Sequence, residues 1–183
     1  NEILSTIRLQ KRGLLEPYRS PSAAGYPEWT RPSDGTWQAF AARARVLIVN
    51  TRLVGEAERP TSLFDLIQPK WKDRVAMAKP QFGTTATQAA CLFEVLGEEA
   101  AKSLYLGLKS NGVKILAGNK QVAEEVGAGR VAVGLTDQDD ALGEVEAARP
   151  VAALFPDRDG HPRHDRRAVL LLPYTLALTT PGP

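Results

Sequence analysis

The sequence holds very few of the residues on which many functional sites depend. Its 183 residues include one cysteine, two histidines and one methionine, and the net charge is only +2. The single thiol of Cys91 cannot form an internal disulfide or a structural zinc site built from cysteines. Because the charge is small and no run of Lys and Arg contains interleaved aromatics, the sequence argues against nucleic acid as a partner.

Long apolar segments and common catalytic motifs are missing as well. No apolar run approaches the roughly 18 residues of a membrane-spanning helix. The patterns GxxxxGKS/T and GxSxG do not occur, which excludes a nucleotide P-loop and a nucleophile elbow. His161 and His164 flank Pro162 in a charged segment that is typical of a surface loop rather than a metal site. We therefore expect a protein that is not an enzyme, with acid/base catalysis by Asp137 and Asp139 as the alternative.

What the sequence does contain is an alternation of helix and strand patterns. Apolar residues make up 43% of the chain and charged residues 24%, as in a soluble globular protein with a substantial core. The spacing of apolar residues predicts helices over 2–12, 63–67, 85–96, 98–109, 119–127 and 141–148. Short apolar runs predict strands over 46–49, 74–78, 113–116, 131–135, 151–155, 168–172 and 174–179. This alternation predicts an α/β fold with a mainly parallel sheet flanked by helices on both faces.

A first candidate site lies at the start of the helix that follows Gly83. Thr85 and Gln88 have the spacing of a capping box. Gly83, Thr84 and Thr85 also bring a glycine and two hydroxyls to a helix start. Free N–H groups and the helix dipole favour a phosphate, carbonate or carboxylate at such a place. Ordinary helix capping is the alternative.

A second candidate is the segment 117–141, AGNKQVAEEVGAGRVAVGLTDQDDA. It predicts a helix capped by Asn119, a glycine stop, a buried strand and an acidic loop with Asp137, Asp139 and Asp140. Ligands bind at the carboxyl ends of strands in open α/β sheets. Clustered carboxylates suit a hard cation or an ammonium group, although the glycine and distal glutamate of a calcium loop are missing. Acids on the dipole of a solvated helix start are the alternative.

Several segments, taken in order, resemble one known family. They are NEILSTIR at 1–8, RARVLIVNT at 43–51, PKWKDRVAMAKP at 69–80, FGTT at 82–85, GLTD at 134–137 and the closing strands from 151 to 175. The chain resembles the iron(III)-type substrate-binding proteins of bacterial ABC transporters, within the extracellular solute-binding family. No single segment is diagnostic, but the ordered set spans nearly the whole chain.

The resemblance implies a periplasmic-binding-protein-like fold of type II, in which two α/β lobes enclose a ligand cleft. Family members are near twice this length, and the chain opens on Asn1 rather than Met, so we expect a piece that begins partway through the first lobe. Residues 1–44 would be a fragment of that lobe, 45–173 the second lobe, and 174–183 the returning hinge strand. Exposed hinge strands would allow the chain to dimerise.

The resemblance also implies a function. The chain is expected to be the solute-binding component of a bacterial ABC import system, periplasmic or extracellular at the membrane face. It would capture ferric iron or another small anionic or metal-bearing solute in the interlobe cleft and deliver it to a membrane permease. A ligand-sensing module of the same fold is the alternative.

The expected ligand positions lie in four parts of the chain; the resemblance implies those at 2, 83–85 and 119, and the acidic segment after 135 supplies the others. They are Gly83, Thr84, Thr85, Asn119, Thr136 and Asp137 for an anion or the solute, and Glu2 and Asp139 for a metal. No cofactor is expected to be required; a bound Fe3+ with a synergistic anion is what the resemblance implies. Iron binders of the family place two adjacent tyrosines where this chain has Gln138 and Asp139. Because ferric iron favours phenolate oxygens, carboxylates would have to hold a metal here, and a small organic or phosphate-bearing solute is the alternative.

Overall fold

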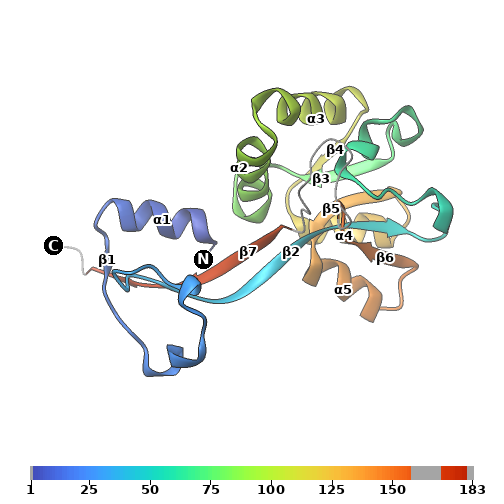
Figure 1. Cartoon of the computed structure of the whole chain (residues 1–183). Coiled ribbons are helices and arrows are strands. Elements are labelled where there is room, and N and C mark those ends of the chain that lie inside the picture. Colours follow the sequence, from blue (N-terminus) through green and yellow to red (C-terminus); the bar gives the residue numbers. More distant parts are fainter. Residues whose placement is uncertain (1, 158–169, 181–183) are drawn as a thin grey trace. The chain divides into compact units, whose positions relative to one another are not determined.

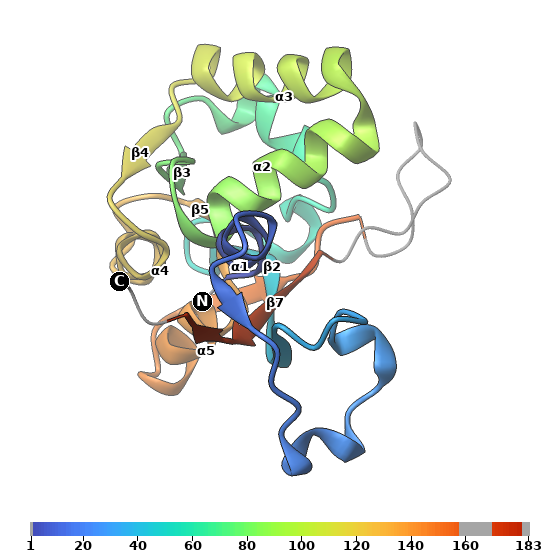
Figure 2. The same cartoon turned by 90° about the vertical axis from the view of Figure 1, so that its left-hand side faces the viewer.

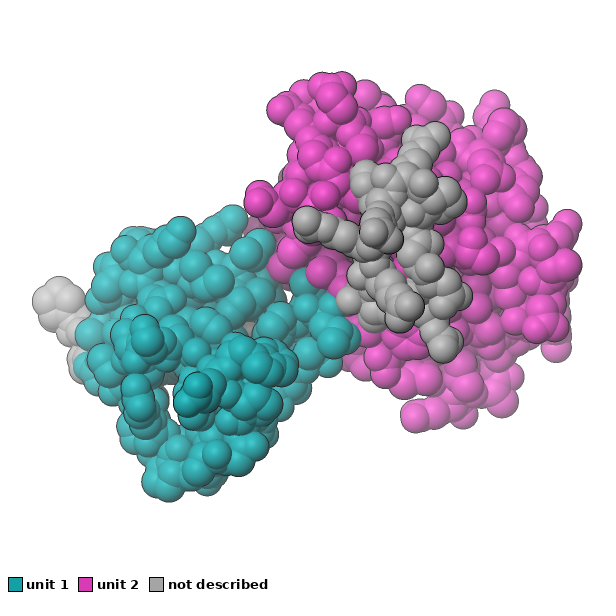
Figure 3. All heavy atoms as spheres, viewed as in Figure 1, with its two compact units in different colours: residues 1–43, 171–183 teal, residues 44–170 magenta. Residues whose placement is uncertain are grey.

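The computed structural model describes residues 2–157 and 170–180 of the chain. Two compact units make up the chain: unit 1 comprises residues 1–43 and 171–183, and unit 2 comprises residues 44–170 (Figure 3). The expected division into a first-lobe fragment, a second lobe and a returning hinge strand stays a prediction. The segment that contains His161 and His164 lies outside the described residues.

Unit 2 is built on a mixed sheet with the strand order β4-β3-β5-β2-β6 (Figure 1). Its strands are the part of β2 (Gln38–Asn50) from residue 44 onward, β3 (Val75–Ala78), β4 (Lys114–Leu116), β5 (Val133–Asp137) and β6 (Val151–Leu154). β3 pairs in parallel with both β4 and β5, as the alternation of helices and strands predicts. β2 pairs antiparallel with β5 and β6, so the sheet is parallel on one side and antiparallel on the other.

Helices cover both faces of this sheet, which confirms the predicted α/β class. They are α2 (Gly83–Leu96), α3 (Glu98–Ser110), α4 (Asn119–Gly127) and α5 (Gln138–Glu146), with 3-10 helices η3 (Glu56–Glu58), η4 (Leu63–Ile67) and η5 (Pro69–Trp71). Alternate strand residues point to opposite faces. Leu47 and Leu135 pack with residues of α3 and η4, whereas Ile48 and Ala76 pack with residues of α4 and α5. Figures 1 and 2 show α2 and α3 on one side of the sheet and α5 on the other.

Unit 1 is smaller and has little core of its own. Its elements are α1 (Ile3–Lys11), β1 (Leu15–Glu16), η1 (Pro21–Gly25), η2 (Glu28–Thr30), β7 (Leu171–Leu176) and β8 (Leu178–Thr179). β7 pairs with β2 and runs through Pro173, where a break between two strands was expected, while β1 and β8 form a two-stranded antiparallel sheet. Among its described residues, the buried apolar side chains are Leu15, Ala23, Ala39 and Leu172.

Three local predictions are wrong: two concern helix caps, and the third concerns an acidic loop whose alternative, a helix start, is what the structure has. α2 begins at Gly83 and not at Thr85, and its N-cap makes no side-chain hydrogen bond, so no capping box forms. Asn119 is the first residue of α4, whose cap is Gly118. The expected acidic loop is instead the end of β5 and the first turn of α5. The side chains of Thr85 and Asn119 bond to each other across two helices.

Candidate functional site

The predicted ligand-binding residues of unit 2 meet at one edge of its sheet. β3, β4 and β5 run parallel, so their carboxyl ends lie together. β3 leads into α2, β4 into α4 and β5 into α5, with four residues or fewer in each connection. Ligands of open α/β sheets bind at such an edge. We call it the carboxyl edge of unit 2.

Three helices begin at the carboxyl edge without side-chain caps. Their N-cap residues are Phe82, Gly118 and Asp137, and none of the three bonds its own helix through its side chain. Gly83 opens α2 with φ at 60°, a left-handed conformation that glycine adopts readily. The N–H groups of a first helical turn have no partner within their helix, and they carry the positive end of its dipole. The edge therefore offers backbone donors to an anionic group.

A buried ion pair joins β2 and β5 at this edge. Arg45 lies opposite Asp137 in the strand register, and its Nη1 is 2.7 Å from Oδ1 of Asp137. Both side chains are only 1% exposed. Nε of Arg45 donates to Oε1 of Gln88 on α2 (2.9 Å), whereas Nη2 has no hydrogen-bond partner among the described residues. Removal of either charge would leave the other buried and uncompensated, which is strongly destabilising.

The carboxylate of Asp137 also ties the starts of α2 and α4 together. Its Oδ2 accepts hydrogen bonds from Oγ1 of Thr84 (2.7 Å) and Nδ2 of Asn119 (3.0 Å). Nδ2 of Asn119 donates in addition to Oγ1 of Thr84 (2.9 Å), which also accepts from Nη1 of Arg45 (3.3 Å). An amide nitrogen has two N–H groups, and a hydroxyl has one O–H and two lone pairs. The side-chain donors of Asn119 and Thr84 are therefore all in use within the protein.

Two further threonines bond to Asn119. Oγ1 of Thr85 donates to its Oδ1 (3.1 Å), and Oγ1 of Thr136 donates to its backbone carbonyl (2.9 Å). Both threonines are buried. The structure thus brings Thr84, Thr85, Asn119, Thr136 and Asp137 together, as the sequence predicts. Because these side chains bond mainly to one another, the backbone N–H groups of the helix starts are the donors best placed for a solute.

Carboxylates gather at the start of α5. One oxygen from each of Asp137, Asp139 and Asp140 lies within 4.8 Å of the others. Asp137 is buried, Asp140 is half-buried and Asp139 is exposed. Oxygen ligands of this kind suit hard cations.

Glu2, the other predicted metal ligand, lies in unit 1, where its carboxylate accepts hydrogen bonds from the first turn of α1.

Arg45 and Gln88, which complete the buried network, are absent from the ligand positions expected from the sequence. Arg45 directly precedes the apolar run 46–49. Charged residues are rarely buried without a partner, so an arginine beside a predicted buried strand indicates a buried acid elsewhere. Tyr105 on α3 lies near the same guanidinium: burial raises the pKa of Tyr105 to about 12, and the charge of Arg45 acts in the opposite direction.

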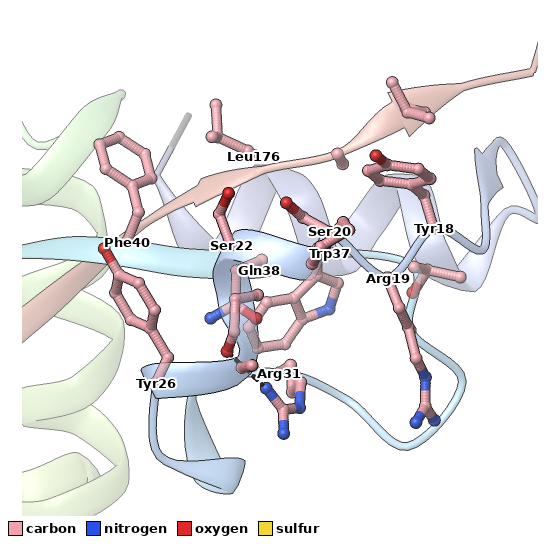
Figure 4. A pocket seen from close by; sticks show the side chains of 17 residues that line it. Tyr18, Arg19, Ser20, Ser22, Tyr26, Arg31, Trp37, Gln38, Phe40 and Leu176 are labelled. Atoms are coloured by element: carbon pink, nitrogen blue, oxygen red, sulfur yellow. Dashed lines mark hydrogen bonds between the residues drawn. The ribbon is translucent and has the colours of Figure 1, made fainter.

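Unit 1 contains a hollow of its own, with a volume of about 710 Å³ (Figure 4). Aromatic side chains line much of it: Tyr18, Tyr26, Trp37 and Phe40. Arg31, also at its wall, donates from Nη1 to the backbone carbonyl of Ala23 (3.1 Å). None of the predicted ligand-binding residues lines this hollow, so it is separate from the site expected from the sequence.

A family model described as bacterial extracellular solute-binding protein matches residues 6–155. The match includes α2, α4, β5 and α5, and with them the whole carboxyl edge. The chain belongs to the bacterial extracellular solute-binding proteins. This membership confirms the resemblance drawn from the ordered motifs. The family is one of solute-binding proteins and not of enzymes.

Relatives of this solute-binding protein include proteins whose names refer to iron. The Fe(3+)-binding periplasmic protein of Serratia marcescens is 34% identical over 122 residues, which cover 67% of this chain and 36% of the relative. Iron uptake protein A1 of Synechocystis is 27% identical over 167 residues, which cover 86% of this chain and 46% of the relative. The chain therefore spans less than half the length of these two relatives.

Solved structures confirm the fold of this solute-binding protein. Iron-bound HitA from Pseudomonas aeruginosa matches with a TM-score of 0.79 and 25% identity, covering 94% of this chain and 55% of that one. The ferric binding protein from Campylobacter jejuni matches with a TM-score of 0.80 and 21% identity, covering 97% of this chain and 58% of that one.

Within the described residues, every helix is too short or too polar to span a bilayer.

Proposed function

We propose that this chain is the solute-capturing part of a bacterial ABC import system. It binds ferric iron or another small metal-bearing or anionic solute at the carboxyl edge of unit 2, and a membrane permease receives that solute. The observation that carries the proposal is the meeting of three uncapped helix starts and a carboxylate cluster at one edge, in a chain of the solute-binding family. Its place would be periplasmic, as the name of the Serratia relative says of that protein, or extracellular, as the description of the family says.

The donors at this edge support a hard cation as the solute or as part of it. Asp139 and Asp140 supply carboxylate oxygens in the first turn of α5. Such oxygens suit hard metal ions, and the names of the Serratia and Pseudomonas relatives refer to iron. The first-turn amides of α2 and α4 would hold an anionic part of the solute. Glu2 stays a proposed metal ligand from unit 1.

The proposal is tested by metal binding to a variant of the carboxylate cluster. Isothermal titration with Fe3+ and with Mn2+ is compared for the wild type and for Asp139→Asn/Asp140→Asn. We expect the variant to lose at least about tenfold in affinity for the metal that binds. Native mass spectrometry of the wild-type chain, purified without added ligand, identifies any solute that it retains.

A matched control removes two carboxylates from another helix start. Glu98 and Glu99 lie in the first turn of α3, as Asp139 and Asp140 do in α5. Glu98→Gln/Glu99→Gln should leave the metal affinity unchanged. If both double variants bind as tightly as the wild type, the carboxylate cluster takes no part in solute binding.

No chemical turnover belongs to this function. A carrier releases its solute unchanged, so a screen with phosphate esters and amines should yield no product. Neither the sensing module nor an enzyme is favoured by an observation in the described residues. A dimer of the chain remains a proposal, and light scattering of the purified protein over a range of concentrations measures it.

A further inference from the structure

We propose that Asp137 is a built-in anion. Its carboxylate occupies an anion-binding position formed by Arg45, Thr84 and Asn119, so that unit 2 takes its solute without an exogenous anion at that position. The first half of this inference stands on the contacts of the buried network alone. The second half rests on the proposed function.

The three donors around Asp137 have the chemistry of an oxyanion site. A guanidinium, a hydroxyl at the start of α2 and a side-chain amide at the start of α4 converge on one carboxylate. Charge-assisted hydrogen bonds from arginine and donors at helix starts are the usual means by which proteins hold small oxyanions. Here the oxyanion belongs to the chain itself, at the last residue of β5.

A free anion would compete poorly for this position. The carboxylate of Asp137 is covalently part of β5, so its binding costs no loss of translational freedom, as that of a free anion would. Its side chain is also only 1% exposed. Its charge balances that of Arg45, while Asp139 and Asp140 add negative charge beside it. At this position the network therefore repels a free anion more strongly than an unpaired arginine would, whereas the first-turn amides of α2 and α4 lie outside the network and can still bind an anionic part of the solute.

One hydrogen-bond donor of Arg45 is not used in binding Asp137. Asp137 uses one oxygen for Arg45 and the other for Thr84 and Asn119, and Nη2 of Arg45 has no hydrogen-bond partner among the described residues. A guanidinium binds both oxygens of a carboxylate when their geometry allows. A small free carboxylate in the space of a truncated Asp137 would be able to reach both terminal nitrogens of Arg45.

Chemical rescue tests the first half of the inference. Asp137→Ala leaves Arg45 buried without its partner, and we expect the thermal unfolding midpoint of the 183-residue chain to fall by roughly 10 °C. Sodium formate should then raise that midpoint with the logarithm of its concentration, as for a ligand of the native state only. Sodium chloride at equal ionic strength should raise the midpoint of Asp137→Ala less. In the wild type, formate and chloride should change the midpoint equally.

Two controls separate an anion site from a general salt effect. Asp137→Asn fills the same space with a neutral amide, so it should show no formate-specific response. Glu125→Ala removes a carboxylate from Arg130 and Lys114, whose side chains are at least half exposed, so formate should not rescue it either. If Asp137→Ala folds only in formate, the inference is supported. An equal response of Asp137→Ala to both salts, or equal failure to fold in both, overturns it.

The second half is tested with Mn2+ chloride as the probe. The wild-type affinity for Mn2+ should stay within about twofold whether or not phosphate or bicarbonate is present, and a tenfold gain with either anion would contradict the inference. If the wild type binds neither Mn2+ nor Fe3+ under any of these conditions, the metal-binding part of the proposed function fails. The formate result stands apart from that failure because it needs no solute.

Discussion

At the scale of single residues, charged side chains in unit 2 differ according to their access to water. Arg45 and Asp137 are buried and depend on each other. Glu125 on α4 bonds instead to side chains nearer the surface: its Oε1 lies 2.8 Å from Nη2 of Arg130, and its Oε2 lies 2.7 Å from Nζ of Lys114. Hydrogen bonds from Arg130 and then Lys114 lower the pKa of Glu125 to about 2.

The low pKa of Glu125 predicts a pH-dependent contribution to stability. A carboxyl whose pKa is lower in the folded than in the unfolded state stabilises the fold above its unfolded pKa of about 4.3. That contribution is lost as the pH falls from there towards 2. The unfolding midpoint of Glu125→Gln should therefore lie below that of the wild type at neutral pH, and the difference should shrink on acidification.

Circular dichroism melts over a series of pH values measure this difference. Glu98→Gln serves as the control, because its ion pair with Lys102 on α3 is exposed and contributes little. A difference between Glu125→Gln and the wild type that stays constant down to acid pH would contradict the assignment of the low pKa.

At the scale of elements, the contact of α4 with β5 shows how closely helices approach this sheet. Gly134 of β5 faces α4, and a Cβ added there would lie 2.5 Å from Cγ1 of Val122 and 3.1 Å from Cγ2 of Val126. The glycine thus permits a close approach of helix and strand. Gly143 of α5 differs, because an added Cβ would meet no atom within 4 Å.

These two glycines predict alanine substitutions of opposite effect. Gly134→Ala should destabilise the chain by about 1–3 kcal/mol, because the extra methyl overpacks the interface with α4. Gly143→Ala should stabilise it by about 0.5–1 kcal/mol, because alanine lowers the entropy cost of the helix. Urea unfolding of both variants measures the two changes in the free energy of unfolding. Changes of the same sign would show that the interface of α4 with β5 adjusts to an added methyl group more easily than its close packing suggests.

At the scale of the whole molecule, the two units differ in how much apolar surface they bury. Both described core clusters lie within unit 2, on the two faces of its sheet. Unit 1 has four buried apolar side chains among its described residues, and its own sheet pairs two residues of β1 with two of β8. Large side chains such as Trp29 and Tyr18 are exposed there. Local opening should therefore cost less free energy in unit 1.

Hydrogen exchange of the native chain should show this difference. We expect the amides of β3 and β5 to exchange at least about a hundredfold more slowly than those of β1 and β8, because the former are buried between two cores. Mass spectrometry of peptic peptides follows both sets of amides in one experiment. Equal protection would mean that the two units unfold as one cooperative body.

Local patterns predicted most of the elements correctly. The apolar spacing of 98–109 predicted α3, and the short apolar run of 113–116 predicted β4, each to within one residue at either end. Such signals depend on neighbours within one or two turns of chain, which is why they are readable without a fold. The family was identified differently, from an ordered set of motifs that spans nearly the whole chain.

The helix starts at the carboxyl edge were predicted less well. Thr85 and Asn119 have the composition of caps, but each side chain bonds a residue more than 30 positions away. A tertiary hydrogen bond of this kind competes with local capping and leaves no trace in sequence spacing. The sequence therefore located the candidate site but assigned its polar side chains the wrong partners.

By itself, the sequence determined the α/β class, the family and the stretches of chain that form the candidate site. Only the tertiary structure decided that Arg45 faces Asp137, because these residues are 92 positions apart and meet through the register of β2 and β5. Strand register depends on which faces are buried across the whole sheet. That long-range choice placed Asp137, one of the predicted ligand positions, at the centre of a buried network.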